Sequence, residues 1–198
     1  MLNIKSSTLA ALLLCASKKD VRYYLQGVYF TVNKSGQPVA VATDGKRLLA
    51  VKLDAPSLPF APRIIPREAL EQAAKAKGEV EIGLTEITLR SGTKIPYQPI
   101  DGRFPDYTRI LPPTEREAGE PILDSQYVAD FAKVAQLLTG IKGAPVLFSP
   151  GGAKGVVLVR FTTAEAVGLV MSMLRGELPD FDRSLFEEGS TKREEVAT

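Results

Sequence analysis

The chain has 198 residues, of which 44% are hydrophobic and 24% charged, and a formal net charge of +2, as in ordinary globular proteins. Its length suits one large domain or two small ones, and no apolar run approaches the ~20 residues of a membrane-spanning helix. A single cysteine, Cys15, excludes an internal disulfide and fits a reducing compartment, and no cleavage site follows the apolar run "LAALLLCA", so we predict a cytoplasmic protein.

The first group of predicted elements is a short strand, "LNIK", followed by a helix from about Ser7 to Lys19. Ser6 or Ser7 can cap this helix, and one apolar face has helical spacing: Leu9, Leu12, Leu13 and Ala16. Three strands follow: "VRYYLQGVYFTVN", "PVAVAT" and "RLLAVKL". Asn33 to Gln37 and Asp44-Gly45 supply the turns between them.

The same order of elements is then written twice more. The second group is "PRIIP", a helix from about Arg67 to Lys77, and the strands "EVEIGL", "EITLRS" and "TKIPYQPI". The third is "EPILDS", a helix from about Gln126 to Leu138, and the strands "APVLFSP", "GVVLVRF" and "AVGLVMSM". Ile4, Ile64 and Ile122 are predicted to hold equivalent places, so the chain is predicted to contain three β-α-β-β-β units.

Each unit has one apolar helix face and one apolar sheet face, so units must pair to bury them. We predict a complete two-unit domain at residues 1–112, with units at 1–58 and 59–112. A third unit at 113–175 needs a partner, and an acidic tail follows at 176–198. The tail holds seven acids and three bases, a charge of −4, so the remaining 175 residues carry +6. A basic body with an acidic tail is a weak indication of a polyanion partner. The alternative is an ordinary solvated surface.

One motif is written twice, as "GRFPDYTRIL" from Gly102 and "GELPDFDRSL" from Gly176. Aligning the last strands of units two and three places these glycines at the same position. We interpret the motif as the exit from a unit: the glycine ends the strand, and Pro-Asp with an aromatic turns the chain along a neighbouring surface.

These segments resemble the β sliding clamp family, the processivity subunit of bacterial DNA polymerase III. The resemblance lies in "DVRYYLQGVYF", "VATDGKRLLAV", "RIIPREALE", "IDGRFPDYTRILP" and "AVGLVMSML". Residues 1–112 resemble the clamp's middle domain and residues 120–175 the second half of its last domain. The resemblance implies an α+β DNA clamp fold of about one and a half domains, with helices lining a hole that duplex DNA passes through without sequence-specific contact.

The family also carries a groove for partner peptides, roughly of the form Gln-x-x-Leu-Phe. The resemblance transfers its walls to four segments of this chain: Leu25; Thr43, Gly45, Lys46, Arg47 and Leu48; Pro105, Arg109 and Ile110; Leu169, Val170, Met171, Ser172 and Met173. Aliphatic walls suit a Leu-Phe pair, methionines adapt to different ligands, and Arg47 and Arg109 can hold polar groups. The alternative for the aliphatic members is plain core.

Basic residues near the three helices are the candidate DNA-facing groups: Lys18, Lys19, Arg67, Lys75, Lys77, Lys133 and Lys142. Lysines also favour helix C-termini through the helix dipole, so solvated helix ends are the alternative. In the tail, "DRSLF" resembles the groove's own ligand pattern. We hypothesise that Leu185 and Phe186 insert into a groove, and the alternative is that they anchor the tail on nearby surface.

The sequence contains no histidine, which excludes the usual zinc sites and Ser-His or Cys-His nucleophiles, and "GGAKG" is predicted to be a hairpin turn instead of a phosphate loop. We predict a non-catalytic protein with no cofactor and no metal. The leading hypothesis is a clamp-like DNA-tethering homo-oligomer, dimer or tetramer, whose groove binds a DNA polymerase or other partners. Its alternatives are a ringless groove-bearing adaptor or decoy, and a degenerate remnant.

Overall fold

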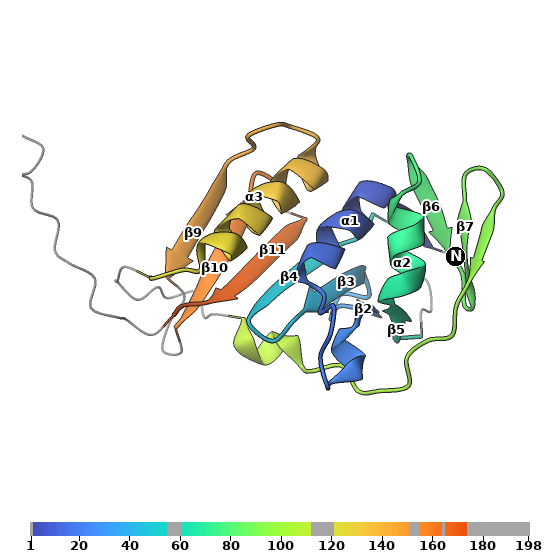
Figure 1. Ribbon diagram of the computed structural model, residues 1–198, viewed down its shortest axis with the longest axis horizontal. Helices are drawn as coiled ribbons and strands as arrows, with labels where there is room; N and C mark the ends of the chain where they lie inside the picture. The colour runs from blue at the N-terminus through green and yellow to red at the C-terminus, as the bar shows by residue number, and fades with distance from the viewer. Residues whose placement is uncertain (1, 55–60, 112–120, 151–154, 164, 174–198) are drawn as a thin grey trace, which may run out of the picture.

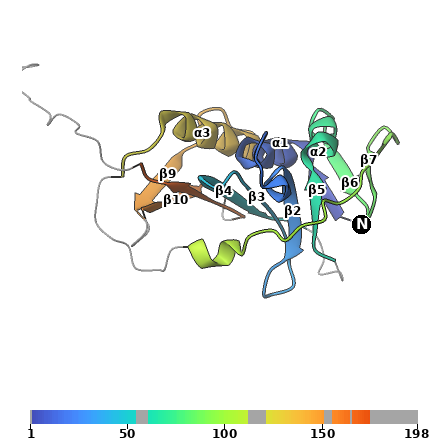
Figure 2. The same cartoon turned by 60° about the horizontal axis from the view of Figure 1, so that its bottom comes forward.

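The computed structural model describes residues 2–54, 61–111, 121–150, 155–163 and 165–173. Two sheets, of four and seven strands, lie on one side, and the helices α1, α2 and α3 stand in a row on the other (Figures 1 and 2). The predicted α+β class is confirmed, and so is the predicted order of elements, except for the strand expected before the third helix. No helix of the described ranges combines the length and the apolarity needed to cross a membrane.

The elements follow the three predicted groups. Unit one contains β1 (Leu2–Lys5), α1 (Ser6–Cys15), β2 (Gly27–Val32), β3 (Pro38–Thr43) and β4 (Arg47–Lys52). Unit two contains β5 (Arg63–Pro66), α2 (Arg67–Ala74), β6 (Glu79–Ile82), β7 (Glu86–Leu89) and β8 (Lys94–Pro96). Unit three contains α3 (Ser125–Thr139), β9 (Val146–Pro150), β10 (Val156–Phe161) and β11 (Ala166–Met171). Short 3₁₀ turns lie at Tyr23–Leu25 and Tyr107–Ile110.

Units one and two exchange their first strands. The four-stranded sheet has the order β1-β6-β7-β8, so the strand that precedes α1 pairs with unit two. The seven-stranded sheet has the order β5-β2-β3-β4-β11-β10-β9, so the strand that precedes α2 pairs with unit one. Unit three joins the same sheet because β11 pairs antiparallel with β4, with Leu169 opposite Leu48. The three units therefore form one continuous structure.

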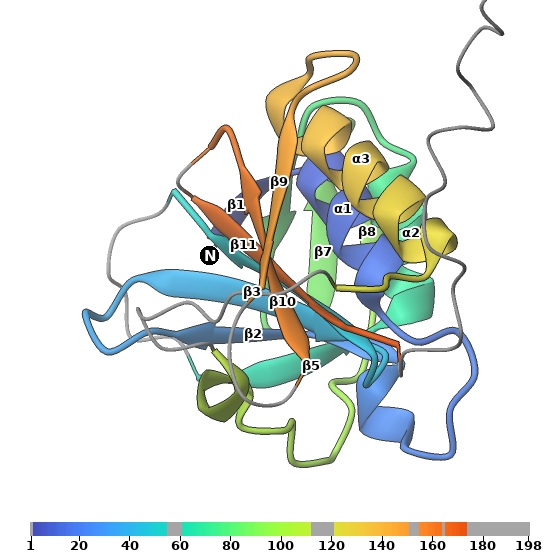
Figure 3. The ribbon, with the colours of Figure 1, turned by 90° about the vertical axis from the view of Figure 1, so that its left-hand side faces the viewer.

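Strand alternation divides the core into two layers. The larger cluster lies between the helices and the sheets and includes Leu12 of α1, Leu49 of β4 and Phe131 of α3. The smaller cluster lies on the outer face of the seven-stranded sheet and includes Leu48 of β4, Leu169 of β11 and Phe104. Figure 3 shows the helices on one side of this sheet and the segment that ends in the Tyr107–Ile110 turn on the other.

Helix α1 is the central helix of the row, between α2 and α3, and it is apolar around most of its circumference. Its last carbonyl groups have no partners within the helix, because the final turn of any helix leaves them free. Two arginines from other elements bind them. Arg67 of α2 donates to the carbonyls of Leu13 and Ala16, each at 3.0 Å, and Arg47 of β4 donates to the carbonyl of Leu14 at 2.6 Å.

The same Arg47 side chain also binds unit three. Its Nη1 donates to Asp130 of α3, and its guanidinium lies 4.5 Å from the centre of the Tyr127 ring. Asp44 lies 3.2 Å from its Nε. The guanidinium is therefore a joint between β4, the end of α1 and α3, and Arg67 joins α1 to α2 in the same region.

Helix α3 lies close to the sheet because Gly168 of β11 has no side chain. A Cβ atom at Gly168 would lie only 2.5 Å from the Phe131 ring, which is fully buried. The ring also packs against Phe148 and Phe161 of neighbouring strands. The glycine therefore sets how closely α3 approaches β11.

Several sequence predictions about local structure are wrong. Residues 21–33 form a 3₁₀ turn and a shorter strand in place of one long strand. The cap of α1 is Lys5 and makes no side-chain capping bond, so neither serine caps this helix. Residues 121–124 form no strand, although "EPILDS" was predicted to be one; no neighbouring strand is described from which they could accept or donate ladder hydrogen bonds.

The predicted equivalence of Ile4, Ile64 and Ile122 is also wrong by one residue. The helices begin at residues 6, 67 and 125, so the position two residues before each helix is Ile4, Ile65 and Leu123. Ile4 and Ile65 both lie in the helix-side core, whereas Ile64 lies in the outer cluster. A shift of one residue along a strand turns a side chain to the other face.

The predicted turns are confirmed, and the first exit motif is confirmed in part: β8 ends at Pro96, so Gly102 does not end the strand, but the motif does lead the chain along a neighbouring surface. Asn33 accepts hydrogen bonds from Ser35 and Gln37, and Gly45 has a φ of 88° in the β3–β4 turn. After Gly102 the chain crosses the outer face of the sheet, where Phe104 stacks on Tyr29 at 4.9 Å. The second exit motif and most of the "GGAKG" turn lie outside the described residues.

We expect Arg47→Ala to destabilise the protein by about 2–4 kcal/mol, because it leaves a shielded Asp130 and a helix-end carbonyl without their partner. The measurement is urea unfolding followed by circular dichroism. The control is Arg22→Ala, since Arg22 forms an exposed ion pair with Asp20 and its loss should change the stability far less than the loss of Arg47. Equal effects of the two substitutions would contradict the role of Arg47 as a joint.

We expect Cys15 to be unreactive toward thiol reagents in the folded protein. The side chain is fully buried, and burial raises the pKa of its thiol to about 12, so almost no thiolate is present near neutral pH. Labelling with a colourimetric thiol reagent at pH 8 should proceed only after denaturation. Rapid labelling of the native protein would show that the α1 environment opens.

The raised pKa also predicts a pH dependence of stability. The unfolded thiol ionises at its ordinary pKa of 9.0, whereas the folded thiol stays protonated up to about 12. Its contribution to stability is therefore complete below pH 9 and is lost as the pH rises toward 12. The difference in unfolding free energy between the natural protein and Cys15→Ala should accordingly shrink from pH 8 to pH 11, and a constant difference would contradict the assignment.

Candidate functional site

A small apolar pocket lies on the outer face of the seven-stranded sheet, where β4 of unit one meets β11 of unit three. Its lining comes from the β3–β4 turn, the Tyr107–Ile110 turn and the strands β10 and β11: Thr43, Gly45, Lys46, Arg47, Leu48, Ile110, Val156, Leu169, Val170 and Met171. The structure thus brings together three segments that the sequence predicted to form one groove, although they are separated by more than fifty residues along the chain.

The geometry of the strands explains the apolar character of the pocket. Leu169, Met171 and Met173 alternate along one side of β11 and its extension, so they share the outer face with Leu48. Leu48 and Leu169 are buried at the bottom, at 1% and 2% exposure, whereas Met171 and Met173 are 43% and 55% exposed. A buried aliphatic floor is therefore bordered by accessible flexible side chains.

The β3–β4 turn forms one end of the pocket and is held by its own hydrogen bonds. Asp44 accepts from the backbone of Lys46 and Arg47, and the Thr43 hydroxyl donates to the Arg47 carbonyl at 2.6 Å. Gly45 is needed in this turn because its φ is positive, a conformation that other residues rarely adopt.

Two predicted groove residues line the pocket with their backbone only. Val170 pairs with Arg47 across the β4–β11 ladder, and both side chains point to the helix layer. The Arg47 guanidinium is engaged with Leu14 and Asp130 on that face, so it is not positioned to hold a ligand on the outer face. Lys46, which lines the pocket, and Arg109, next to Ile110, are exposed cations on this face.

The remaining predicted groove residues lie around the pocket. Leu25 is buried in the outer core cluster, at 1% exposure, and forms part of the support beneath it. Ser172 and Met173 continue beyond β11, where the Met173 N–H donates to the Ile122 carbonyl at 2.8 Å. Arg109 is exposed on the turn that carries Ile110.

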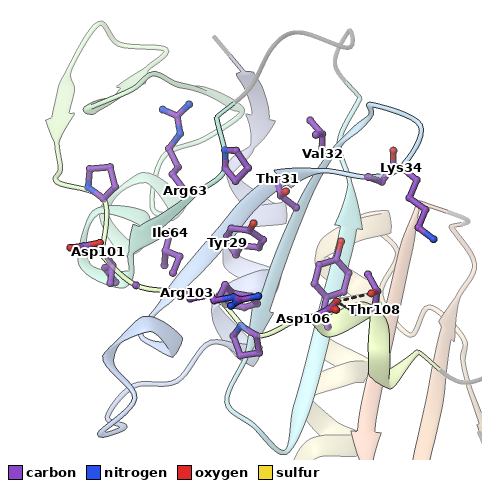
Figure 4. Close-up of a pocket in the computed structure, with 18 of the residues that line it drawn as sticks. Tyr29, Thr31, Val32, Lys34, Arg63, Ile64, Asp101, Arg103, Asp106 and Thr108 are labelled. Atoms are coloured by element: carbon purple, nitrogen blue, oxygen red, sulfur yellow. Dashed lines mark hydrogen bonds between the residues drawn. The ribbon is translucent and has the colours of Figure 1, made fainter.

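Pro105 lies instead in a broad, open hollow next to the pocket, between β2 and the exit segment (Figure 4). In Figure 4 the polar groups of Asp106 and Thr108 meet at one end of this hollow, where Thr108 donates to Asp106 from both its backbone and its hydroxyl. These bonds lower the pKa of Asp106. Burial raises the pKa of neighbouring Tyr107. The hollow carries charges of both signs.

Sequence reasoning missed Val156. It lies opposite Met171 in the β10–β11 ladder and completes the apolar floor. The hairpin prediction contained the necessary signal, since the residue across the strand from a groove methionine must share its face.

Most of the predicted DNA-facing groups are exposed at the helix layer. Lys18, Lys19, Lys75, Lys77, Lys133 and Lys142 are exposed, and none of the ion pairs found in the described residues involves them. Arg67 differs, because its guanidinium binds the end of α1 and Glu71. Leu185 and Phe186 lie outside the described residues, and within those residues no cluster of His, Cys, Asp or Glu could hold a metal ion.

Residues 4–106 match the family model described as "DNA polymerase III beta subunit, central domain". The beta sliding clamp of Pseudomonas aeruginosa is 40% identical over 105 residues, covering 48% of this chain and 28% of that protein. The beta sliding clamp of Salmonella typhimurium is 39% identical over 121 residues, covering 55% of this chain and 32% of that protein. The chain therefore spans about a third or less of these curated relatives.

The similarity of fold extends further along the chain. A sliding clamp from Bartonella birtlesii, bound to griselimycin, superposes with a TM-score of 0.66 at 22% identity, covering 88% of this chain and 66% of that one. The Bacillus subtilis clamp gives the same TM-score at 18% identity, covering 88% and 64%. Unit three thus shares the clamp fold although the family model ends at residue 106.

A match to the central-domain model over half of the chain, together with clamp structure over most of it, leads to one conclusion: the chain belongs to the DNA polymerase III beta subunit, or beta sliding clamp, family, which is non-catalytic.

Proposed function

We propose that this protein is a cytoplasmic, clamp-like DNA-tethering homo-oligomer that binds short peptides of a DNA polymerase, or of other replication and repair partners, in the pocket between β4 and β11. The observation that carries this proposal is the pocket itself. It combines residues from units one and three into a single apolar depression with flexible side chains at its border.

The pocket has the chemistry that a Leu-Phe peptide needs. The floor of Leu48, Val156 and Leu169 is aliphatic, and Met171 can adapt its shape to an aromatic ring. Lys46 and Arg109 are exposed nearby and can bind a carboxylate or backbone carbonyls of the peptide. Arg47 contributes indirectly, because it holds the turn and the strand whose outer surface forms the pocket.

The helix layer supports non-specific attraction to duplex DNA. Its exposed lysines come from all three units, and the helices lie side by side on one face of the molecule (Figure 2). Phosphate contacts of this kind need no base recognition, and they weaken as salt rises. The pocket lies on the opposite face of the sheet, so DNA and a partner peptide would not compete for the same surface.

For the peptide site, we expect Met171→Glu to weaken binding of a fluorescent Gln-x-x-Leu-Phe peptide by about tenfold or more, because it places a charge at an apolar border. Fluorescence anisotropy measures the affinity, and circular dichroism checks folding. The matched control is Leu84→Glu, which alters a residue that is 69% exposed in the turn between β6 and β7. Equal affinities of the two variants would refute the pocket as the binding site.

For DNA, we expect the double substitution Lys18→Glu and Lys133→Glu to weaken binding to a duplex. The slope of the logarithm of the binding constant against the logarithm of the salt concentration should become shallower by ~0.9 per lost phosphate contact. The control replaces the exposed Lys34 and Arg160, on β-hairpins away from the helices, and should leave the slope unchanged. If both pairs act alike, the helix layer is not the DNA-facing surface. Retention on closed circular but not linear DNA would support a ring, whereas equal retention on both would support the ringless adaptor.

A further inference from the structure

The outer edge of β9 is open. β9 pairs with β10 on one side, and no strand among the described residues lies on its other side (Figure 1). Leu147 is 52% exposed, and the helix-facing residues Val146 and Phe148 are only partly buried. Their counterparts in units one and two, such as Val28 and Val80, are almost completely buried. An open edge with apolar side chains is a ready surface for another strand.

Units one and two show what normally covers such an edge. The strand before α1 pairs with β6, with Ile4 opposite Val80, and the strand before α2 pairs with β2, with Ile65 opposite Val28. In both cases, the residue two positions before the helix lies opposite the first helix-facing residue of the partner unit's strand. The chain therefore contains two examples of one reciprocal arrangement.

Unit three holds the donor segment for the same arrangement. Residues 121–124 lead directly into α3, as β5 leads into α2. The Met173 N–H donates to the Ile122 carbonyl at 2.8 Å, as the Ile100 N–H donates to the Ile64 carbonyl at 2.9 Å. Ile122 and Ile64 each lie three residues before their helix. Residues 121–124 are thus held by their own unit in the place of β5, but no described strand occupies the position that β2 has beside β5.

Helix α3 has an open side as well. Tyr127 and Asp130 turn toward Arg47 and the neighbouring α1. Val128 and Ala132 are one helical turn apart on the other side; Val128 is partly exposed and Ala132 is exposed. Side chains this small allow a second helix to approach closely, as α1 and α2 approach each other within the first two units.

We propose that a second copy of this chain covers these surfaces. Each copy inserts residues 121–124 beside β9 of the other, with Leu123 opposite Val146, and the two α3 helices pack against each other around a two-fold axis. A second copy is the occupant that fits, because each copy carries both an open donor segment and an open acceptor edge. One symmetric contact therefore pairs both donor segments with both acceptor edges. The product is a dimer whose two third units form one complete clamp-type domain.

This dimer specifies the homo-oligomer of the proposed function. It is supported by the open edge of β9, by residues 121–124 and by the open side of α3, and it does not depend on the peptide pocket. Loss of dimerisation would leave the peptide pocket of β4 and β11 intact within one chain, so the two proposals fail in different experiments. The dimer contact is made by β9, α3 and residues 121–124, none of which line the pocket.

The first test is the mass of the full chain in solution by sedimentation equilibrium. We expect twice 21.4 kDa at micromolar concentrations. Ala132→Arg should raise the dimer dissociation constant at least tenfold, whereas Gln126→Arg, which is also exposed but lies one helical turn from Asp130 on the flank of α3 nearer α1, should leave it unchanged. A monomer at all concentrations up to ~100 μM, or equal effects of the two variants, would overturn the proposal.

The second test is the strand register. Leu123→Cys and Val146→Cys are prepared separately, mixed in equal amounts and oxidised, with the buried Cys15 left in place. We expect a covalent dimer on a non-reducing gel from the mixture and none from either variant alone, since only the mixture brings the two thiols opposite each other. A dimeric protein that gives no cross-link in the mixture would place the interface elsewhere and overturn the proposal.

Discussion

The structure depends on which groups form hydrogen bonds with the last carbonyls of helix α1. Any helix leaves its last carbonyls without intrahelical partners, and in α1 these carbonyls are buried among three units. Arg47 from β4 and Arg67 from α2 donate to them, and Arg47 also binds Asp130 and Tyr127 of α3. The hydrogen bonds that the last carbonyls of α1 need are thus supplied by side chains that also join the three units.

This arrangement separates two roles that the sequence alone assigned to the same residues. Arg47 and Arg67 are conspicuous cations, and they were predicted to face a peptide and DNA, respectively. Both serve mainly to join elements. Exposed cations such as Lys46 and Arg109 on the outer face, and the lysines of the helix layer, remain available to ligands. Long basic side chains close to helix ends are thus poor indicators of a ligand site unless their burial is known.

The residue pattern predicted the repeat and, apart from the strand before α3, the order of elements, because strand alternation and helix spacing follow directly from it. Most of the pocket residues came instead from the resemblance to the clamp family. The residue pattern did not predict features that depend on contacts between distant segments. The exchange of β1 and β5 between units has no local signal. Residues 121–124 have the pattern of a strand, yet a strand forms only where a neighbour supplies hydrogen bonds.

The pocket and the joint between units one and three are two sides of the same pair of strands. On β4, Arg47 points to the helices and Leu48 to the pocket; on β11, Gly168 receives the Phe131 ring while Leu169 forms the pocket floor. Any ligand that requires β4 and β11 to stay in register must, by thermodynamic linkage, also favour the closed joint behind them. Ligand binding in the pocket on one face of the sheet is therefore coupled to the contact between units one and three on the other face.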